Sequence, residues 1–105
     1  MRQKPSNYLR SERRRAALSQ ADIAELLREG VRAISRYERG RRLPPLKTAL
    51  AYEAIYGMPA AELFAGTFDR IRKEVRRRAR SLIADGGGSG RNGRRKESLD
   101  IIAAR

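Results

Sequence analysis

Arginine and lysine dominate the chemistry that this chain could perform. The 105 residues include 25 Lys and Arg against 12 Asp and Glu, which gives a net charge of +13. Residues 1–66 carry thirteen basic and seven acidic side chains, and residues 67–105 carry twelve and five, so both parts are positive. Guanidinium groups bind phosphates and the edges of guanine, and a protein this basic attracts polyanions. Nucleic acid is therefore the expected partner, with an anionic membrane surface or an acidic protein as alternatives.

The residue types that are missing exclude most kinds of catalytic site. The sequence has no Cys and no His, so it lacks disulfides, the commonest metal ligands and the usual acid–base catalyst near neutral pH. Asp22, Glu25 and Glu29 share one predicted helix face without a partner catalyst, and we expect them to be solvated charges. No apolar run suits a signal peptide or a membrane span. We therefore expect a soluble cytoplasmic protein that is no enzyme and has no cofactor or metal site.

Capping and turn residues divide residues 6–64 into short helices, and no run of alternating β-branched residues predicts a strand. The expected fold class is therefore all-α. A first helix is predicted to begin at Ser6 or Asn7, since either side chain can cap it, and to end near Ala17.

A second and a third helix follow directly. Ser19 is a typical N-cap, and Asp22 completes a capping-box pattern at the start of a helix over residues 20–27. Gly30 is expected to give the backbone the freedom to turn into a third helix, which runs to Arg39. The apolar face of the second helix is expected to comprise Ile23, Ala24, Leu26 and Leu27.

Two further helices complete the predicted compact part. Pro45 can set the first turn of a helix over residues 46–56, and a short helix is predicted over residues 60–64. Gly66 is expected to close the compact part. The side chains expected to face the core are Leu46, Leu50, Ala54 and Ile55 from the fourth helix and Leu63 and Phe64 from the fifth.

A strongly basic sixth helix is predicted over residues 67–84, with Thr67 as its cap. Its apolar seam consists of Phe68, Val75 and Leu82, widened by Ile71, Ala79 and Ile83. This seam could dock on the compact part or pair with a second subunit. Residues 86–93 have the composition of a flexible linker, and residues 94–105 could form at most a short helix. The chain thus divides into a compact domain at 1–66, a basic amphipathic helix at 67–85 and a flexible basic tail at 86–105.

The segment from Leu18 to Gly40 resembles the helix-turn-helix of the lambda Cro and cI (XRE-like) repressor family. It reads LSQADIAELLREGVRAISRYERG, and the residues at the family spacing are Ser19, Gln20, Ala24, Ile34, Ser35, Arg36, Glu38 and Gly40. The likeness extends over residues 7–66. It implies a five-helix lambda-repressor-like domain that binds double-stranded DNA, with the basic sixth helix and the tail as additions outside the family.

The resemblance assigns base reading to the third helix, which runs from Val31 to Arg39. A helix about 10–12 Å wide fits the major groove when a second helix holds it at a fixed angle. A small residue such as Ala24 permits the close crossing of these two helices, and Ile34 is expected to anchor the third helix in the core. The outward positions, which match the base-reading positions of the family, are Val31, Arg32, Ser35 and Arg36. The two arginines can bind guanine O6 and N7, and Val31 can contact a thymine methyl group.

Other matching positions imply contacts to the DNA backbone or a structural role. Arg13 matches an arginine that pairs with the glutamate at the position of Glu38, which implies an ion pair between the first and third helices. The residues expected at the DNA backbone are Gln20, Arg39, Arg41 and Arg42. One departure concerns the turn: the family usually has Gly and then an apolar residue where this chain has Arg28 and Glu29, followed by Gly30. We therefore expect the turn to differ in detail.

The resemblance implies a sequence-specific transcriptional regulator, by likeness a repressor, that binds a two-fold operator as a homodimer. A single small module buries only roughly 600–1,000 Å² on DNA and reads few base pairs, which favours a dimer. The first alternative is an antitoxin or mobile-element accessory DNA-binding protein that holds a protein partner through residues 67–105. The second is an RNA or membrane-surface binder that uses the basic amphipathic sixth helix.

Overall fold

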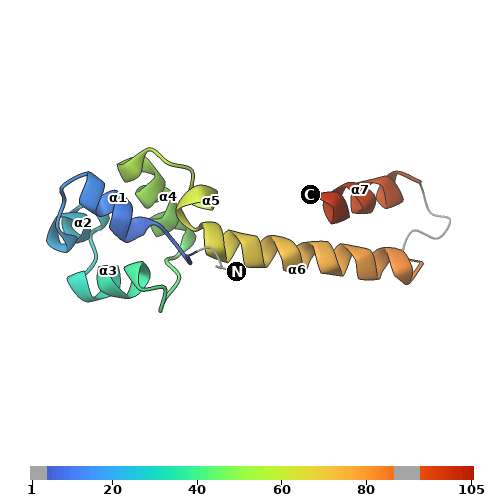
Figure 1. Ribbon diagram of the computed structural model, residues 1–105, viewed down its shortest axis with the longest axis horizontal. Helices are drawn as coiled ribbons and strands as arrows, with labels where there is room; N and C mark the ends of the chain where they lie inside the picture. Colours follow the sequence, from blue (N-terminus) through green and yellow to red (C-terminus); the bar gives the residue numbers. More distant parts are fainter. Residues whose placement is uncertain (1–4, 87–92) are drawn as a thin grey trace. The chain divides into compact units, whose positions relative to one another are not determined.

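The structure of the chain, a computed structural model, describes residues 5–86 and 93–105. Helices are the only regular elements among these residues, which confirms the expected all-α fold (Figure 1). The chain forms two compact units, Met1–Phe68 and Asp69–Arg105. The helices are α1 (Leu9–Arg15), α2 (Gln20–Leu27), α3 (Val31–Glu38), α4 (Leu46–Tyr56), α5 (Ala60–Leu63), α6 (Ala65–Ala84) and α7 (Gly93–Ala104).

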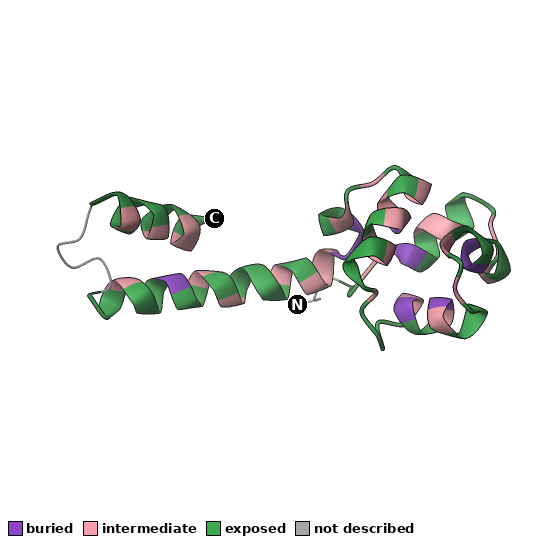
Figure 2. Cartoon of the chain, turned by 180° about the vertical axis from the view of Figure 1, so that it is seen from behind, coloured by how far each residue is buried: buried purple, intermediate pink, exposed green. Residues whose placement is uncertain are grey.

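The core of the first unit is built around Tyr52 on α4. Its ring stacks on that of Tyr56 at a centroid distance of 6.0 Å and makes T-shaped contacts with Tyr37 and Phe64 at 6.3 and 6.2 Å. Aromatic pairs of this kind contribute roughly 0.5–1.5 kcal/mol each beyond the burial of their area. The other helices of the unit supply four fully buried aliphatic side chains: Leu9, Ile23, Ile34 and Leu63. Figure 2 colours the buried stretches of the ribbon purple.

The core face of α4 differs from the expectation. Leu46, Leu50 and Ala54 are exposed, and Leu46 keeps 75% of its surface accessible. The side chains of this helix that pack in the core are Ala49, Tyr52, Ile55 and Tyr56, so the expectation is confirmed for Ile55 only. Because α4 is apolar on both sides, the two large tyrosine rings determine which side is buried, since they remove the most surface from water. We call Leu46, Leu50 and Ala54 the α4 stripe. Leu26 on α2 is also exposed, contrary to expectation.

α1 begins later and ends earlier than expected. Its N-cap position is occupied by Tyr8, whose side chain does not cap it, whereas Asn7 Oδ1 accepts a hydrogen bond from the Leu9 amide at 3.0 Å. The chain leaves α1 through Ala17, which has a positive φ of 58°. The Asn7 side chain therefore accepts a hydrogen bond from a free amide of the first turn, although Asn7 lies one residue before the N-cap position. This is a variant of the expected capping by Ser6 or Asn7.

α2 has the predicted bounds and the predicted capping box. Ser19 Oγ accepts a hydrogen bond from the Asp22 amide at 3.0 Å, and the Asp22 carboxylate accepts one from the Ser19 amide at 2.8 Å. The backbone hydrogen bond from Ser19 holds the pKa of Asp22 below its ordinary value. Asp22 is thus a capping group, and not a freely solvated charge. α4 also has the predicted bounds, with Pro45 at its N-cap position.

α6 begins at Ala65, two residues before the expected Thr67, which therefore lies inside the helix and does not cap it. Gly66 lies in the first turn of the same helix. A Cβ atom at Gly66 would lie 2.2 Å from the carbonyl oxygen of Pro5, so only glycine fits where the N-terminal backbone crosses this helix. The sequence pattern could not reveal this contact, because it joins residues at opposite ends of the unit.

The second unit consists of the greater part of α6 together with α7, which runs alongside α6 in both views (Figures 1 and 2). α7 has twelve residues, although the sequence suggests at most a short helix there. Within the seam predicted on α6, Ala79 is buried, whereas Phe68, Ile71, Val75 and Leu82 are exposed. Residues 87–92 of the expected linker lie outside the described residues. The predicted domain boundaries therefore stay a prediction.

Candidate nucleic-acid interface

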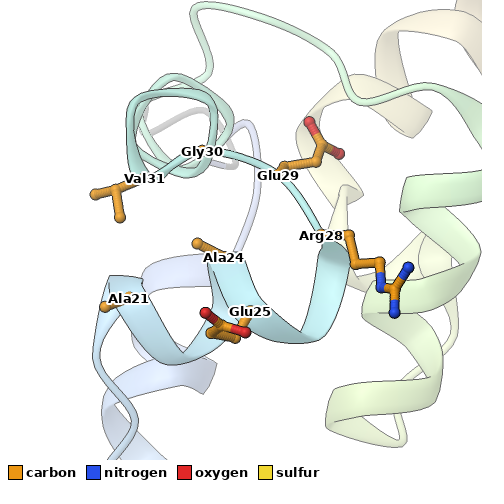
Figure 3. Close-up of a pocket in the computed structure, with 7 residues that line it drawn as sticks. All are labelled: Ala21, Ala24, Glu25, Arg28, Glu29, Gly30 and Val31. Atoms are coloured by element: carbon orange, nitrogen blue, oxygen red, sulfur yellow. The ribbon is translucent and has the colours of Figure 1, made fainter.

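α3 is a short helix of eight residues that the rest of the first unit holds in place. Ile34 is fully buried, and Ala24 on α2 keeps only 8% of its surface accessible. Figure 3 shows Ala24 directed from α2 toward the first turn of α3. The structure thus gives both residues the surroundings that the sequence suggested, an apolar anchor on α3 and a small side chain at the crossing of the two helices.

The outward face of α3 carries the four residues expected to read bases. Arg32 and Arg36 are exposed and lie one helical turn apart, so both guanidinium groups extend from the same side of the helix. Val31 keeps 46% of its surface accessible and projects outward at the first turn (Figure 3), while Ser35 is half-buried. Beside Val31 lies an open hollow of about 410 Å³ between α2 and the turn, left by small side chains such as Ala21. This face therefore presents two long cations and one apolar contact.

The turn between α2 and α3 has its left-handed residue at Arg28, with φ 55° and ψ 48°. Its amide donates to the Glu25 carbonyl at 3.3 Å, and the Glu29 amide donates to the Ala24 carbonyl at 3.0 Å, which is the Schellman arrangement. Gly30 has an ordinary extended backbone with φ −76° and occupies the N-cap of α3. The expected role of Gly30 in turning the chain is thus wrong. Arg28 stands at the position where the family usually has glycine and adopts the conformation that suits glycine.

Arg13, Gln20 and Glu38 form a polar network that joins α1, α2 and α3. The Glu38 carboxylate accepts hydrogen bonds from Arg13 Nε at 2.7 Å and from Arg13 Nη2 at 3.1 Å. Only 2% of the Glu38 side chain and 13% of the Arg13 side chain are accessible. The hydrogen bonds to Glu38 raise the pKa of Arg13 above its ordinary value. Gln20 Nε2 donates to Glu38 at 3.1 Å, so the amide that was expected near a phosphate is directed into this network.

Glu29 forms a second polar network, which the sequence did not reveal. Its two carboxylate oxygens accept hydrogen bonds from the Tyr37 hydroxyl at 2.7 Å and from Thr48 Oγ1 at 2.9 Å. Burial, and then the hydrogen bond to Glu29, raise the pKa of Tyr37. The expectation of a solvated charge at Glu29 is therefore wrong, because this carboxylate ties the turn to both α3 and α4. The one local signal was a charged residue at a position where the family usually has an apolar one.

The loop from Arg39 to Pro45 carries the remaining cations of the predicted interface. Arg39, Arg41 and Arg42 are all exposed. The Arg42 guanidinium also lies over the Tyr37 ring, 5.7 Å from its centroid, in a cation–π contact. The structure thus places these three exposed side chains in the chain segment that directly follows α3.

Two other features, a metal-binding cluster and a membrane-spanning helix, are absent from the described part of the chain. Residues 5–86 and 93–105 contain no group of three or more acidic side chains placed to hold a metal ion. In the same residues, no helix is long and apolar enough to cross a membrane.

Comparison with known proteins identifies the domain. A family model described as helix-turn-helix matches residues 9–63, slightly more than half of the chain, and this segment runs from the first residue of α1 to the last of α5. No curated protein and no solved structure matches the chain. The two crossed helices, the buried anchor of α3 and its exposed arginines agree with this match. The chain belongs to the Cro/C1-type helix-turn-helix family, a non-catalytic family that binds DNA sequence-specifically and is typical of transcriptional regulators.

Proposed function

We propose that this protein is a transcriptional repressor that binds a two-fold operator as a homodimer, with α3 in the major groove. One observation carries the proposal: Arg32 and Arg36 are exposed side by side on a helix that Ile34 and Glu38 fix from behind. A guanidinium fork can make two hydrogen bonds to guanine, but only if the helix that bears it has a fixed position. Val31 and Ser35 complete the base-reading face.

The same geometry supports a separate set of contacts to the DNA backbone. Arg39, Arg41 and Arg42 follow α3 in an exposed loop, where their charges would neutralise phosphates whatever the sequence. Gln20 begins α2, so the free amides of that helix end can bind a phosphate even though the Gln20 side chain contacts Glu38. We therefore assign specificity to α3 and general affinity to the loop and the start of α2.

The α4 stripe supports the proposal of a homodimer. Its exposed leucines begin immediately after the basic loop, so a second copy seated there would bind beside the same stretch of DNA. α4 contains one basic residue, Lys47, and one acidic residue, Glu53, so two copies would meet without net repulsion. Sedimentation with an operator duplex should give two protein chains per site, and Leu50→Glu should reduce this to one. One chain per site at saturation for the unchanged protein would exclude the dimer.

The test of the reading face begins with the selection of bound sites from random DNA. Arg36→Ala should reduce affinity for the selected site by about 5- to 150-fold, which corresponds to roughly 1–3 kcal/mol, and should relax the preference at one base pair. Arg36→Lys keeps the charge but loses the fork, so it should lose most of this preference as well. Arg41→Ala should weaken binding to selected and random DNA alike and flatten the salt dependence.

Equal losses on selected and random DNA for both the Arg36→Ala and the Arg41→Ala proteins would refute these assignments. Full preference retained by Arg36→Lys would show that this residue acts only as a charge. Repression itself is tested with a reporter gene whose promoter contains the selected site. Supplying the protein should lower expression of the reporter, and a rise in expression would contradict the proposed repression.

A further inference from the structure

A row of exposed apolar side chains lies on α6, after the segment that the helix-turn-helix family model matches. Ile71, Val75 and Leu82 are spaced by four and seven residues, so they share one face of the helix. They keep 53%, 45% and 45% of their surface accessible. Single exposed apolar residues are ordinary on a protein surface, but several on one helix face indicate an interaction site. We call these three residues the α6 stripe.

The packing within the second unit leaves the α6 stripe uncovered. On α6, Ala79 is buried to 4% accessibility and Ile83 is half-buried, and on α7 Leu99 and Ile102 are half-buried. The helix pair therefore already buries apolar surface of both helices. The stripe remains half-exposed in the presence of α7, so it is available to something other than α7.

The charge around the α6 stripe determines what kind of partner fits it. α6 contains seven Lys and Arg but only two acidic residues, Asp69 and Glu74. Both carboxylates already bind cations of the same helix: Asp69 contacts Arg72 and Lys73 at 3.4 and 3.1 Å, and Glu74 contacts Arg77 and Arg78. A second copy of α6 would bring two strongly positive helices together, which costs free energy. An acidic partner would instead be attracted by the positive charge of α6.

The cations nearest the α6 stripe are placed to flank a bound helix. Arg72 lies three residues before Val75 and Arg78 three residues after it, so the two guanidinium groups border the stripe on opposite sides. Both are exposed. The long side chains can keep their intrahelical contacts or turn toward a carboxylate of a partner.

We infer that the α6 stripe binds an acidic amphipathic helix of another protein. Such a helix would place apolar residues at helical spacing on Ile71, Val75 and Leu82, and Asp or Glu beside Arg72 and Arg78. This binding is separate from DNA reading, which uses α3, so it stands whether or not the proposed operator contacts hold. It makes the protein an adaptor that connects a DNA site to an acidic protein partner.

The test uses the full-length chain and two synthetic helical peptides of about 20 residues, long enough to span the stripe. Both carry leucines at helical spacing on one face; the flanking positions are Glu in one peptide and Lys in the other. Fluorescence anisotropy should show the Glu peptide binding about tenfold or more tightly than the Lys peptide, with an affinity that falls as salt is added. Equal binding of the two peptides would overturn the inference.

Variants then locate the site. Val75→Gln removes an exposed apolar side chain, and it should weaken binding of the Glu peptide about tenfold. Ile101→Gln on α7 is the matched control, because Ile101 is 55% accessible but lies outside the stripe, and it should leave binding unchanged. Arg78→Glu keeps the stripe but reverses one flanking charge, and it should narrow the difference between the two peptides. Full binding by the Val75→Gln protein would overturn the inference.

Three further measurements exclude other occupants. If Val75→Gln abolished self-association in sedimentation, the stripe would be covered by a second copy. If it reduced binding to a random DNA duplex or to vesicles that contain anionic lipid, the occupant would be nucleic acid or membrane. Each of these results would overturn the inference, whereas unchanged behaviour in all three together with loss of the Glu peptide supports it.

Discussion

Arg28 should be a site where glycine stabilises the protein. Its backbone is left-handed, with φ 55° and ψ 48°, a conformation that costs an L-residue with a Cβ atom about 1–2 kcal/mol. Glycine avoids this cost but loses about 0.5–1 kcal/mol through the greater freedom of the unfolded chain. Arg28 is exposed, and its side chain makes no hydrogen bond or ion pair with the described residues, so little else is lost. Arg28→Gly should therefore raise the free energy of unfolding by about 0.5–1 kcal/mol.

The assay is urea and thermal unfolding of the full chain, followed by far-ultraviolet circular dichroism. A gain of this size should raise the Tm by about 2–8 °C for a domain of this length and shift the urea midpoint without a change in slope. Arg28→Ala is the matched control, because it removes the same side chain but keeps the Cβ atom. It should show none of the gain. The DNA sequence preference of Arg28→Gly should be unchanged, since the turn keeps its geometry.

Two results would refute this reasoning. If Arg28→Gly were no more stable than Arg28→Ala, the left-handed residue would not be strained by its side chain. Gly30→Ala provides the second test, because a Cβ atom at Gly30 would meet nothing within 4 Å and the φ there is −76°. A loss well above about 1 kcal/mol for Gly30→Ala would place the positive φ of this turn at Gly30 instead of Arg28.

Three other substitutions test the packing of the first unit. Gly66→Ala should lower the free energy of unfolding, measured in urea, by about 1–3 kcal/mol, because the new Cβ atom would overlap the Pro5 carbonyl. This loss is expected even though alanine favours helices more than glycine does. A higher free energy of unfolding would contradict the contact between Gly66 and Pro5. Burial raises the pKa of Tyr56 to about 12, so folding favours the neutral phenol, and the free energy of unfolding should fall as the pH rises from 10 toward 12. In the Tyr56→Phe protein this fall should be less steep. An unchanged pH profile would exclude Tyr56 as its cause. Glu38→Gln should lower the free energy of unfolding by about 3 kcal/mol, because it leaves the Arg13 guanidinium without a counter-charge. A loss below about 1 kcal/mol would mean that the Arg13–Glu38 pair contributes no more than a surface ion pair.

Local signals in the sequence predicted the helices that depend on local chemistry. Ser19 and Asp22 are three residues apart and satisfy each other's backbone amides, so the start of α2 could be identified without knowledge of the fold. Pro45 before the helix and Gly57 after it delimited α4 in the same way. The placement of Arg32 and Arg36 on the outside of α3 followed from the helical repeat once Ile34 was taken as the anchor.

The resemblance implied one distant contact, the ion pair between Arg13 and Glu38, but other features that depend on distant contacts could not be predicted. α4 is apolar on two sides, and only the assembled ring cluster around Tyr52 shows that Leu50 faces outward. Glu29 looked solvated because its partners, Tyr37 and Thr48, lie 8 and 19 residues away. Gly66 was expected to close the compact part, because the backbone of Pro5, which lies against it, belongs to the other end of the domain and gives no local signal in the sequence. In each case, the deciding neighbour is remote in sequence.

The hydrogen-bonded carboxylates of Glu29 and Glu38 explain how a helix as short as α3 can have a fixed orientation. Eight residues are too few for a helix to be stable alone, so the direction of α3 must come from its contacts. Glu38 joins its last turn to α1 and α2, and Tyr37 joins the same turn through Glu29 to the loop that begins α3 and to α4. Substitutions at these inward groups should therefore change stability and DNA specificity together, whereas substitutions of Arg32 or Arg36 should change DNA binding and leave stability unchanged.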